Sequence, residues 1–195
     1  MVQTLALLIA CALLSGCSHL KVDSTETATG QRRLRNNSCS LLYEMLNQEK
    51  NVSKLLLIKA ERPEVNKLIK DISAAAGAGA TKLEELARQD PGLNIHVPGL
   101  PPGERAARDS ISKALTGELL RATGDDFELR LLLTQIEALH YSTHLAQVAA
   151  ANEPQPSRTR EFTALGEEMH RLYQQVVALL RSRMPPLNRD KAVKP

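Results

Sequence analysis

The feature that most constrains the fold of this chain is a three- and four-residue spacing of aliphatic and small residues between positions 63 and 89. These positions are Val65, Leu68, Ile69, Ile72, Ala75, Ala76, Gly79, Leu83 and Leu86. Because an α-helix has about 3.6 residues per turn, this spacing places them on one broad face. Pro63 suits the first turn of a helix, and Asp90-Pro91-Gly92 ends it. The segment is predicted to be a long helix that packs against other helices.

Four further segments show the same helical pattern, over 38–60, 104–122, 127–151 and 159–184. A β-sandwich or barrel is not expected, because the chain has only two Phe, three Tyr and no Trp, and such folds depend on aromatic and β-branched residues. The predicted fold class is all-α. We expect one helical-bundle domain over 38–184, with four long helices and one short helix in a ferritin-like or related up-down arrangement.

A stretch with almost no side-chain volume, Ala74-Ala75-Ala76-Gly77-Ala78-Gly79-Ala80, lies in the middle of the segment 63–89. Each glycine costs a helix about 1 kcal/mol relative to alanine, unless the close approach of another helix compensates. The stretch therefore indicates either a tight helix crossing, which we favour, or a break in the helix. It is also the expected wall of any apolar groove.

The N-terminus carries the most specific motif. Residues 2–14 are apolar apart from Gln3 and Thr4, and they are too few to cross a bilayer, which needs about 20. They run into Leu14-Ser15-Gly16-Cys17, which resembles the lipobox of bacterial lipoproteins. The resemblance implies a signal peptide over 1–16, cleavage before Cys17, and a diacylglycerol and an N-acyl lipid on Cys17, with no other cofactor. The alternative is that 5–17 form a buried helix with an internal cysteine.

Such an anchor attaches a protein to a membrane without spanning it. Ser18 follows the cysteine, which under the sorting rule of enterobacterial lipoproteins implies the outer membrane, with the domain facing the periplasm. Residues 17–37 are polar and predict a flexible tether, and residues 185–195 predict a disordered tail. The membrane, through the lipid anchor, and an envelope protein are the expected partners.

Charge and cysteine content narrow the function classes. With 25 Lys and Arg against 22 Asp and Glu, the net charge is +3 and forms no basic stripe, so a nucleic-acid partner is not expected. Cys39 is the only thiol left after processing, which excludes an internal disulfide. A helix start could make Cys39 reactive, but a small, semi-buried residue is the favoured interpretation.

One set of residues has the spacing of metal ligands. Glu137, His140 and His144 are at i, i+3 and i+7 in the segment 127–151, and Glu167-x-x-His170 repeats the Glu-x-x-His element in the segment 159–184. Carboxylate-bridged di-metal bundles place this element on inner faces. On a helical wheel, however, these residues point away from the apolar seam. A solvated polar face is therefore the favoured interpretation, with a surface Zn or Cu site and a buried di-metal centre as alternatives.

Several short motifs are similar to a family of uncharacterised bacterial envelope proteins with a ferritin-like helical bundle. They are Leu-Glu-Glu-Leu-Ala over 83–87, a Pro- and Gly-rich connector, and Gly-Asp-Asp-Phe-Glu over 124–128, followed by Gln135 and a histidine. The similarity covers roughly 38–182. It implies a ferritin-like bundle in the bacterial envelope.

These features predict a lipid-anchored envelope protein whose bundle is a binding or structural component for an unknown ligand. Two alternatives stay open, a metal-binding ferritin-like bundle and a lipid- or peptide-binding module. An enzyme is not indicated, because the sequence has no phosphate-binding loop, no nucleophile elbow and no Cys-x-x-Cys motif.

The lipobox generates the first prediction. Replacing Cys17 with Ser removes the sulfur that accepts diacylglycerol, so labelling of cells with a palmitate analogue should be lost from the Cys17→Ser chain. The control is Cys39→Ser, which should be labelled like the unaltered chain. Equal labelling of Cys17→Ser and the unaltered chain would contradict the lipobox assignment.

Overall fold

The computed structural model describes residues 24–57, 59 and 62–183. The chain divides into two compact units, 1–30 and 31–195. Of the first unit, only the helical residues 24–30 are described, and everything below concerns the second. The elements are α1 (Ser24–Glu49), the short 3-10 helix η1 (Val52–Leu57), α2 (Pro63–Gln89), α3 (Pro102–Arg121), α4 (Gly124–Ala151) and α5 (Pro156–Arg183). The described residues contain helices and no strand, so the all-α fold class is confirmed.

Most helix boundaries follow the local signals of the sequence. α2 has the predicted bounds, with Pro in its first turn and Asp90 as its C-cap. α3 and α5 begin two or three residues earlier than predicted, at Pro102 and Pro156. α4 begins at Gly124, three residues before the predicted start at 127; Gly124 has φ +56°, and the N-cap is Thr123. Asp125 and Asp126 lie in the first turn, where their charge stabilises the helix dipole.

The first helix differs most from the prediction. α1 begins at Ser24, so residues 24–37 are helical although they belong to the predicted tether 17–37. It ends at Glu49, and η1 follows, where a single helix over 38–60 was expected. Residues 31–34 are exposed, but Arg35 is only 4% exposed. Lipobox residues 14–17, the signal segment 1–16 and the predicted tail 185–195 lie outside the described residues.

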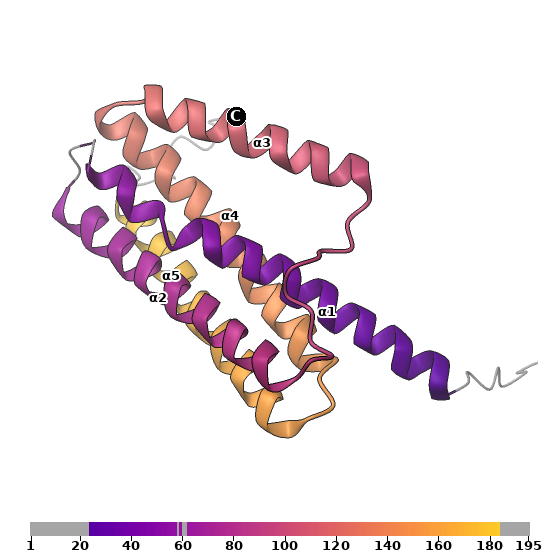
Figure 1. The fold of residues 1–195 in the computed structure, drawn as a ribbon. Helices are drawn as coiled ribbons and strands as arrows, with labels where there is room; N and C mark the ends of the chain where they lie inside the picture. Colours follow the sequence, from indigo (N-terminus) through magenta and orange to yellow (C-terminus); the bar gives the residue numbers. More distant parts are fainter. Residues whose placement is uncertain (1–23, 58, 60–61, 184–195) are drawn as a thin grey trace, which may run out of the picture. The chain divides into compact units, whose positions relative to one another are not determined.

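Four helices form the core. Its largest fully buried side chains come from α1, α2, α4 and α5, among them Leu42, Leu46, Ile69, Ile72, Leu83, Leu131, Phe162 and Met169. α3 contributes only Leu119 to the buried set of the described residues. From Gln31 onward, α1 lies alongside α2 and α4, whereas α3 lies farther out, beside α1 and α4 (Figure 1). The bundle therefore has one helix that covers it incompletely.

The small-residue stretch of α2 is a tight crossing, as favoured from the sequence. A Cβ at Gly79 would lie 2.8 Å from Leu165 Cδ1 of α5 and 3.0 Å from Leu46 Cδ1 of α1. No larger residue fits here without displacing these side chains. Because the crossing is filled, the Ala74–Ala80 stretch is not the wall of a groove.

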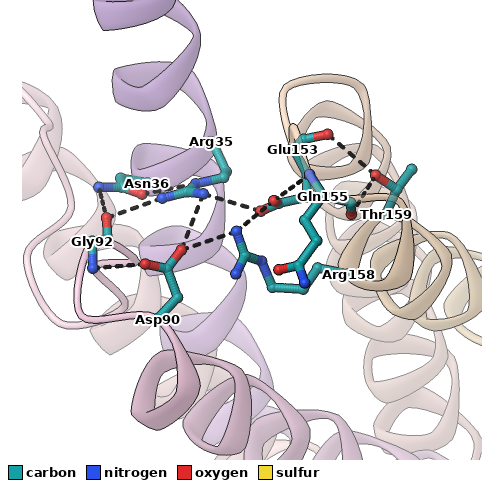
Figure 2. A network of polar contacts seen from close by, with 8 residues as sticks. All are labelled: Arg35, Asn36, Asp90, Gly92, Glu153, Gln155, Arg158 and Thr159. Atoms are coloured by element: carbon teal, nitrogen blue, oxygen red, sulfur yellow. Dashed lines mark hydrogen bonds and ion pairs between the residues drawn. The ribbon is translucent and has the colours of Figure 1, made fainter.

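A network of four charged residues joins the helices at one end of the bundle (Figure 2). Arg35 of α1 contacts Asp90, which caps α2, at 3.3 Å and Glu153, in the α4–α5 loop, at 3.1 Å. Arg158 of α5 contacts the same two carboxylates at 3.1 and 2.7 Å. The side chain of Glu153 is fully buried. Two positive and two negative charges thus neutralise one another in a largely buried network, and Arg35 also donates to the carbonyl of Gly92.

Burial alone would raise the pKa of Glu153. The hydrogen bond from Arg158, the backbone N–H of Gln155, and the charges of Arg158 and Arg35 outweigh it and hold the pKa below its ordinary value. A carboxyl with a lowered pKa in the folded state stabilises the fold above its unfolded pKa of about 4.3. This contribution is lost as the pH falls through the lowered folded value.

Removing this charge should therefore be costly. The change Glu153→Gln leaves the buried guanidinium group of Arg35 and the half-buried one of Arg158 with one carboxylate, and we expect it to lower the free energy of unfolding by about 3 kcal/mol at neutral pH. Urea denaturation measures this difference, which should shrink at pH 3. The control is Glu161→Gln, which breaks an exposed contact of 3.6 Å to Lys82 and should change stability by less than about 0.5 kcal/mol. Equal stability of both variants at neutral pH would contradict the role of the network.

Candidate functional site

The predicted histidine ligands are exposed, as the helical wheel indicated, and two of them are adjacent. His140 and His144 of α4 approach with their Nε2 atoms 3.0 Å apart. His140 also stacks on Tyr173 of α5, with ring centroids 5.3 Å apart, and His170 stacks on the same ring at 5.9 Å. Tyr173 is therefore the contact that His140 and His170 share.

The remaining metal candidate faces elsewhere. Glu137 is exposed and lines a groove beside α3. Nowhere in the described residues do three His, Cys, Asp or Glu side chains gather so that they could hold a metal ion. The structure thus brings His140 and His144 together but forms no site from Glu137, His140, His144 and His170.

Cys39 is a core residue. It is fully buried, and its burial raises the pKa of the thiol to about 12, although the charge of Arg35 acts in the opposite direction. The thiol is therefore protonated and unreactive at neutral pH, which supports the interpretation favoured from the sequence.

A groove of about 690 Å³ with a largely apolar lining lies between α1, η1, α3 and α4. Its aliphatic lining includes Leu41, Met45, Val52, Leu55, Ile111 and Leu115. It exists because α3 is held to the bundle mainly by polar contacts. Arg108 of α3 donates to the hydroxyl of Tyr141 at 3.0 Å, and Lys59 donates to the carbonyls of Leu120 and Ala122. These contacts and Leu119 keep α3 in place, while Ile111 remains 59% exposed.

Two polar groups lie in the wall of this groove. Glu49 is the last residue of α1, and Gln135 lies on α4. Each has a buried oxygen atom without a hydrogen-bond partner, Glu49 Oε2 and Gln135 Oε1. Burial raises the pKa of Glu49 to about 7, although a hydrogen bond from Gln135 lowers it in part. A carboxyl that titrates near neutral pH inside a cleft is typical of a functional site.

No family model, curated protein or solved structure matches the chain. Among the described helices, none is both long enough and apolar enough to cross a membrane.

Sequence reasoning missed Glu49 and gave no role to Gln135. Glu49 falls inside the helix predicted over 38–60, where no pattern singled it out, whereas in the structure α1 ends at Glu49 and its side chain lines the groove with residues of α3 and α4. Gln135 carried a readable signal, because it is a polar residue one turn from Leu131, Leu132 and Leu139, all of which are buried. A buried amide within such an apolar surface needs a polar partner.

The raised pKa of Glu49 predicts a pH-dependent stability with the opposite sign to that of Glu153. The folded state prefers the protonated carboxyl, so the unaltered chain loses stability as the pH rises from the unfolded pKa of about 4.3 towards 7. The change Glu49→Gln removes this loss and should stabilise the chain at pH 8 by roughly 3 kcal/mol, with little effect at pH 4. Urea denaturation at both pH values tests this.

The matched control is Glu44→Gln, an exposed carboxyl of the same helix. Its stability should fall between pH 4 and pH 8 as that of the unaltered chain does. A Glu49→Gln chain that retained the full loss would show that Glu49 is not the group responsible.

Proposed function

We propose that this chain is a lipid-anchored protein of the bacterial envelope whose helical bundle holds an apolar ligand in the groove beside α3. The groove carries this proposal. Its volume of about 690 Å³ lies within the range of about 300–1,000 Å³ that is usual for small-molecule sites. Most such sites also combine an apolar lining with a few polar groups, as this one does. The alternative of a lipid-binding module is thus favoured, but at a different place from the Ala74–Ala80 stretch.

The lipobox supports the envelope location. Diacylglycerol and an N-acyl chain on Cys17 would anchor the protein stably, because each buried CH₂ group contributes about 0.8 kcal/mol. With Ser18 after the cysteine, the anchor belongs to the outer membrane and the domain to the periplasm. A protein at that membrane has apolar molecules nearby as ligands, and an envelope protein is the partner that would deliver or receive them.

For the finer arrangement of the bundle, we propose the ferritin-like up-down order of α1, α2, α4 and α5. Two observations support it. α4 joins α5 through the short loop 152–155, and α1 joins α2 through the segment 50–62, which includes η1. The longer excursion through the connector and α3 lies between these two pairs.

A second candidate function has one specific observation in its favour. With Nε2 atoms 3.0 Å apart, His140 and His144 could both bind one metal ion at about 2.0–2.1 Å, the usual imidazole distance. The resulting angle at the metal is near 90°, which suits Cu(II) or Ni(II). This would be an exposed two-histidine site, different from the buried di-metal centre considered from the sequence.

Photo-crosslinking in intact membranes tests the groove. An n-dodecanol that carries a diazirine should label residues of the groove, such as Met45 and Ile111, and mass spectrometry of the digested protein locates the adducts. The change Leu115→Trp fills the groove from α3 and should reduce this labelling several-fold. The control is Val148→Trp, at an exposed position of α4 outside the groove, which should not. Labelling confined to other surfaces, or equal in both variants, would refute the proposal.

A further inference from the structure

We propose that the groove selects amphiphiles with a protonated amine at one end, and that Glu49 and Gln135 bind this ammonium group. This inference rests on the proposed function, because it names the class of ligand that the groove would hold. Three observations support it. Buried carboxylates elsewhere in the chain are paired with arginine, two oxygen atoms in the groove have no hydrogen-bond partner, and the charged side chains that line the groove are mostly negative.

The fold pairs its other buried carboxylates with arginine. Glu153 lies between Arg35 and Arg158 at 3.1 and 2.7 Å. Glu128 of α4 is only 3% exposed and contacts Arg183 at 2.9 Å and Arg62 at 3.7 Å. Glu49, in contrast, has no ion pair with any residue that the structure describes. The side chain of Glu49 is half-buried, and its Oε2 atom is fully buried. The cation that would neutralise this carboxylate must therefore come from outside the described chain, and the groove is the route to it.

The unpartnered atoms define the chemistry of the ligand's polar end. Glu49 Oε2 and Gln135 Oε1 are both acceptors, both residues line the groove, and Gln135 is near enough to Glu49 to lower its pKa. A ligand that satisfies both must donate at least two hydrogen bonds. An ammonium group has three N–H donors and a positive charge, whereas an alcohol has one donor and no charge. A hydrogen bond between charged groups is also about twice as strong as one between neutral groups.

The charge of the groove agrees with this choice. The titratable or charged side chains that line it together with Glu49 are Glu44 of α1, Glu104, Arg108 and Asp109 of α3, and Glu137 and Tyr141 of α4. Arg108 is the one cation among them, and it already contacts Glu104 at 2.8 Å and Tyr141 at 3.0 Å. The groove thus has a surplus of negative charge in a chain whose net charge is +3. An anionic amphiphile, such as a fatty acid, would be repelled.

The titration of Glu49 makes recognition dependent on pH. Its pKa of about 7 means that the protonated acid predominates at pH 6 and the carboxylate at pH 8. In the acid form, the proton occupies the position at which the ammonium group would bind. Amine binding should therefore strengthen about tenfold from pH 6 to pH 8, in proportion to the carboxylate fraction.

The experiment compares two matched photo-crosslinking probes, diazirine-bearing n-dodecylammonium and the corresponding n-dodecanol, on the full chain in membranes. With the unaltered chain at pH 8, the ammonium probe should label the groove at about tenfold lower concentration than the alcohol. In Glu49→Gln this preference should disappear, and so should the rise between pH 6 and pH 8. Circular dichroism and a cooperative urea transition of Glu49→Gln show whether its bundle is intact.

A matched control removes a carboxylate elsewhere. Glu85 of α2 lies outside the groove and forms an exposed pair of 3.5 Å with Lys82, so Glu85→Gln should keep both the amine preference and its pH dependence. A change in the preference of Glu85→Gln equal to that of Glu49→Gln would overturn the inference, since net charge alone would then be responsible.

The outcomes separate the two proposals. If the alcohol labels the groove but the ammonium probe has no advantage, or keeps it in Glu49→Gln, the inference fails and the apolar groove stands. If neither probe labels the groove, the proposed function fails as well. A dimer in native mass spectrometry that protects the groove from both probes would identify a second copy as the occupant and would overturn both.

Discussion

Burial of paired charges at the ends of the bundle is the constraint on which this fold depends. At one end, Glu153 is held between Arg35 and Arg158, and Asp90 completes a network with no net charge. At the opposite end of α4, Glu128 accepts from the backbone N–H of Arg62 at 2.6 Å and from Arg183 at 2.9 Å. Each network joins a helix end to two other segments. Because an isolated buried charge is far less favourable than a complete network, only one register of the helices satisfies both ends.

α3 belongs to neither of these charge networks, and other contacts determine its position. α3 has a narrow apolar face, of which only Leu119 is buried, and its other contacts to the bundle are hydrogen bonds and ion pairs from Arg108, Glu118 and the carbonyl of Leu120. These contacts hold the helix at a distance without filling the space beneath it. An apolar groove in a stable bundle is therefore a consequence of polar anchoring, and its exposed aliphatic surface is typical of an interaction site.

The sequence predicted those parts of the fold that local signals determine. α2 was correct at both ends, because Pro63, the apolar seam and Asp90-Pro91-Gly92 lie within the segment itself. The start of α1 could not be predicted in this way. Its residues before Ser38 lack apolar periodicity, and the burial of Arg35 depends on partners 55 and 118 positions away. The adjacency of His140 and His144 could be predicted, since it needs only the spacing of one helical turn.

In the candidate site, too, local sequence patterns do not reveal contacts that depend on distant parts of the chain. Glu49 has the sequence environment of a surface residue, yet its Oε2 atom is buried in the groove that Gln135 of α4 also lines. Burial acts to raise the pKa of both Glu49 and Glu153, yet the two pKa values shift in opposite directions. The difference lies in their partners: Glu153 has two guanidinium groups and a backbone N–H, whereas Glu49 has one neutral amide. A buried carboxyl whose network is complete stabilises the fold, and one whose network is incomplete costs stability that a cationic ligand can return. This asymmetry assigns Glu153 to structure and Glu49 to binding.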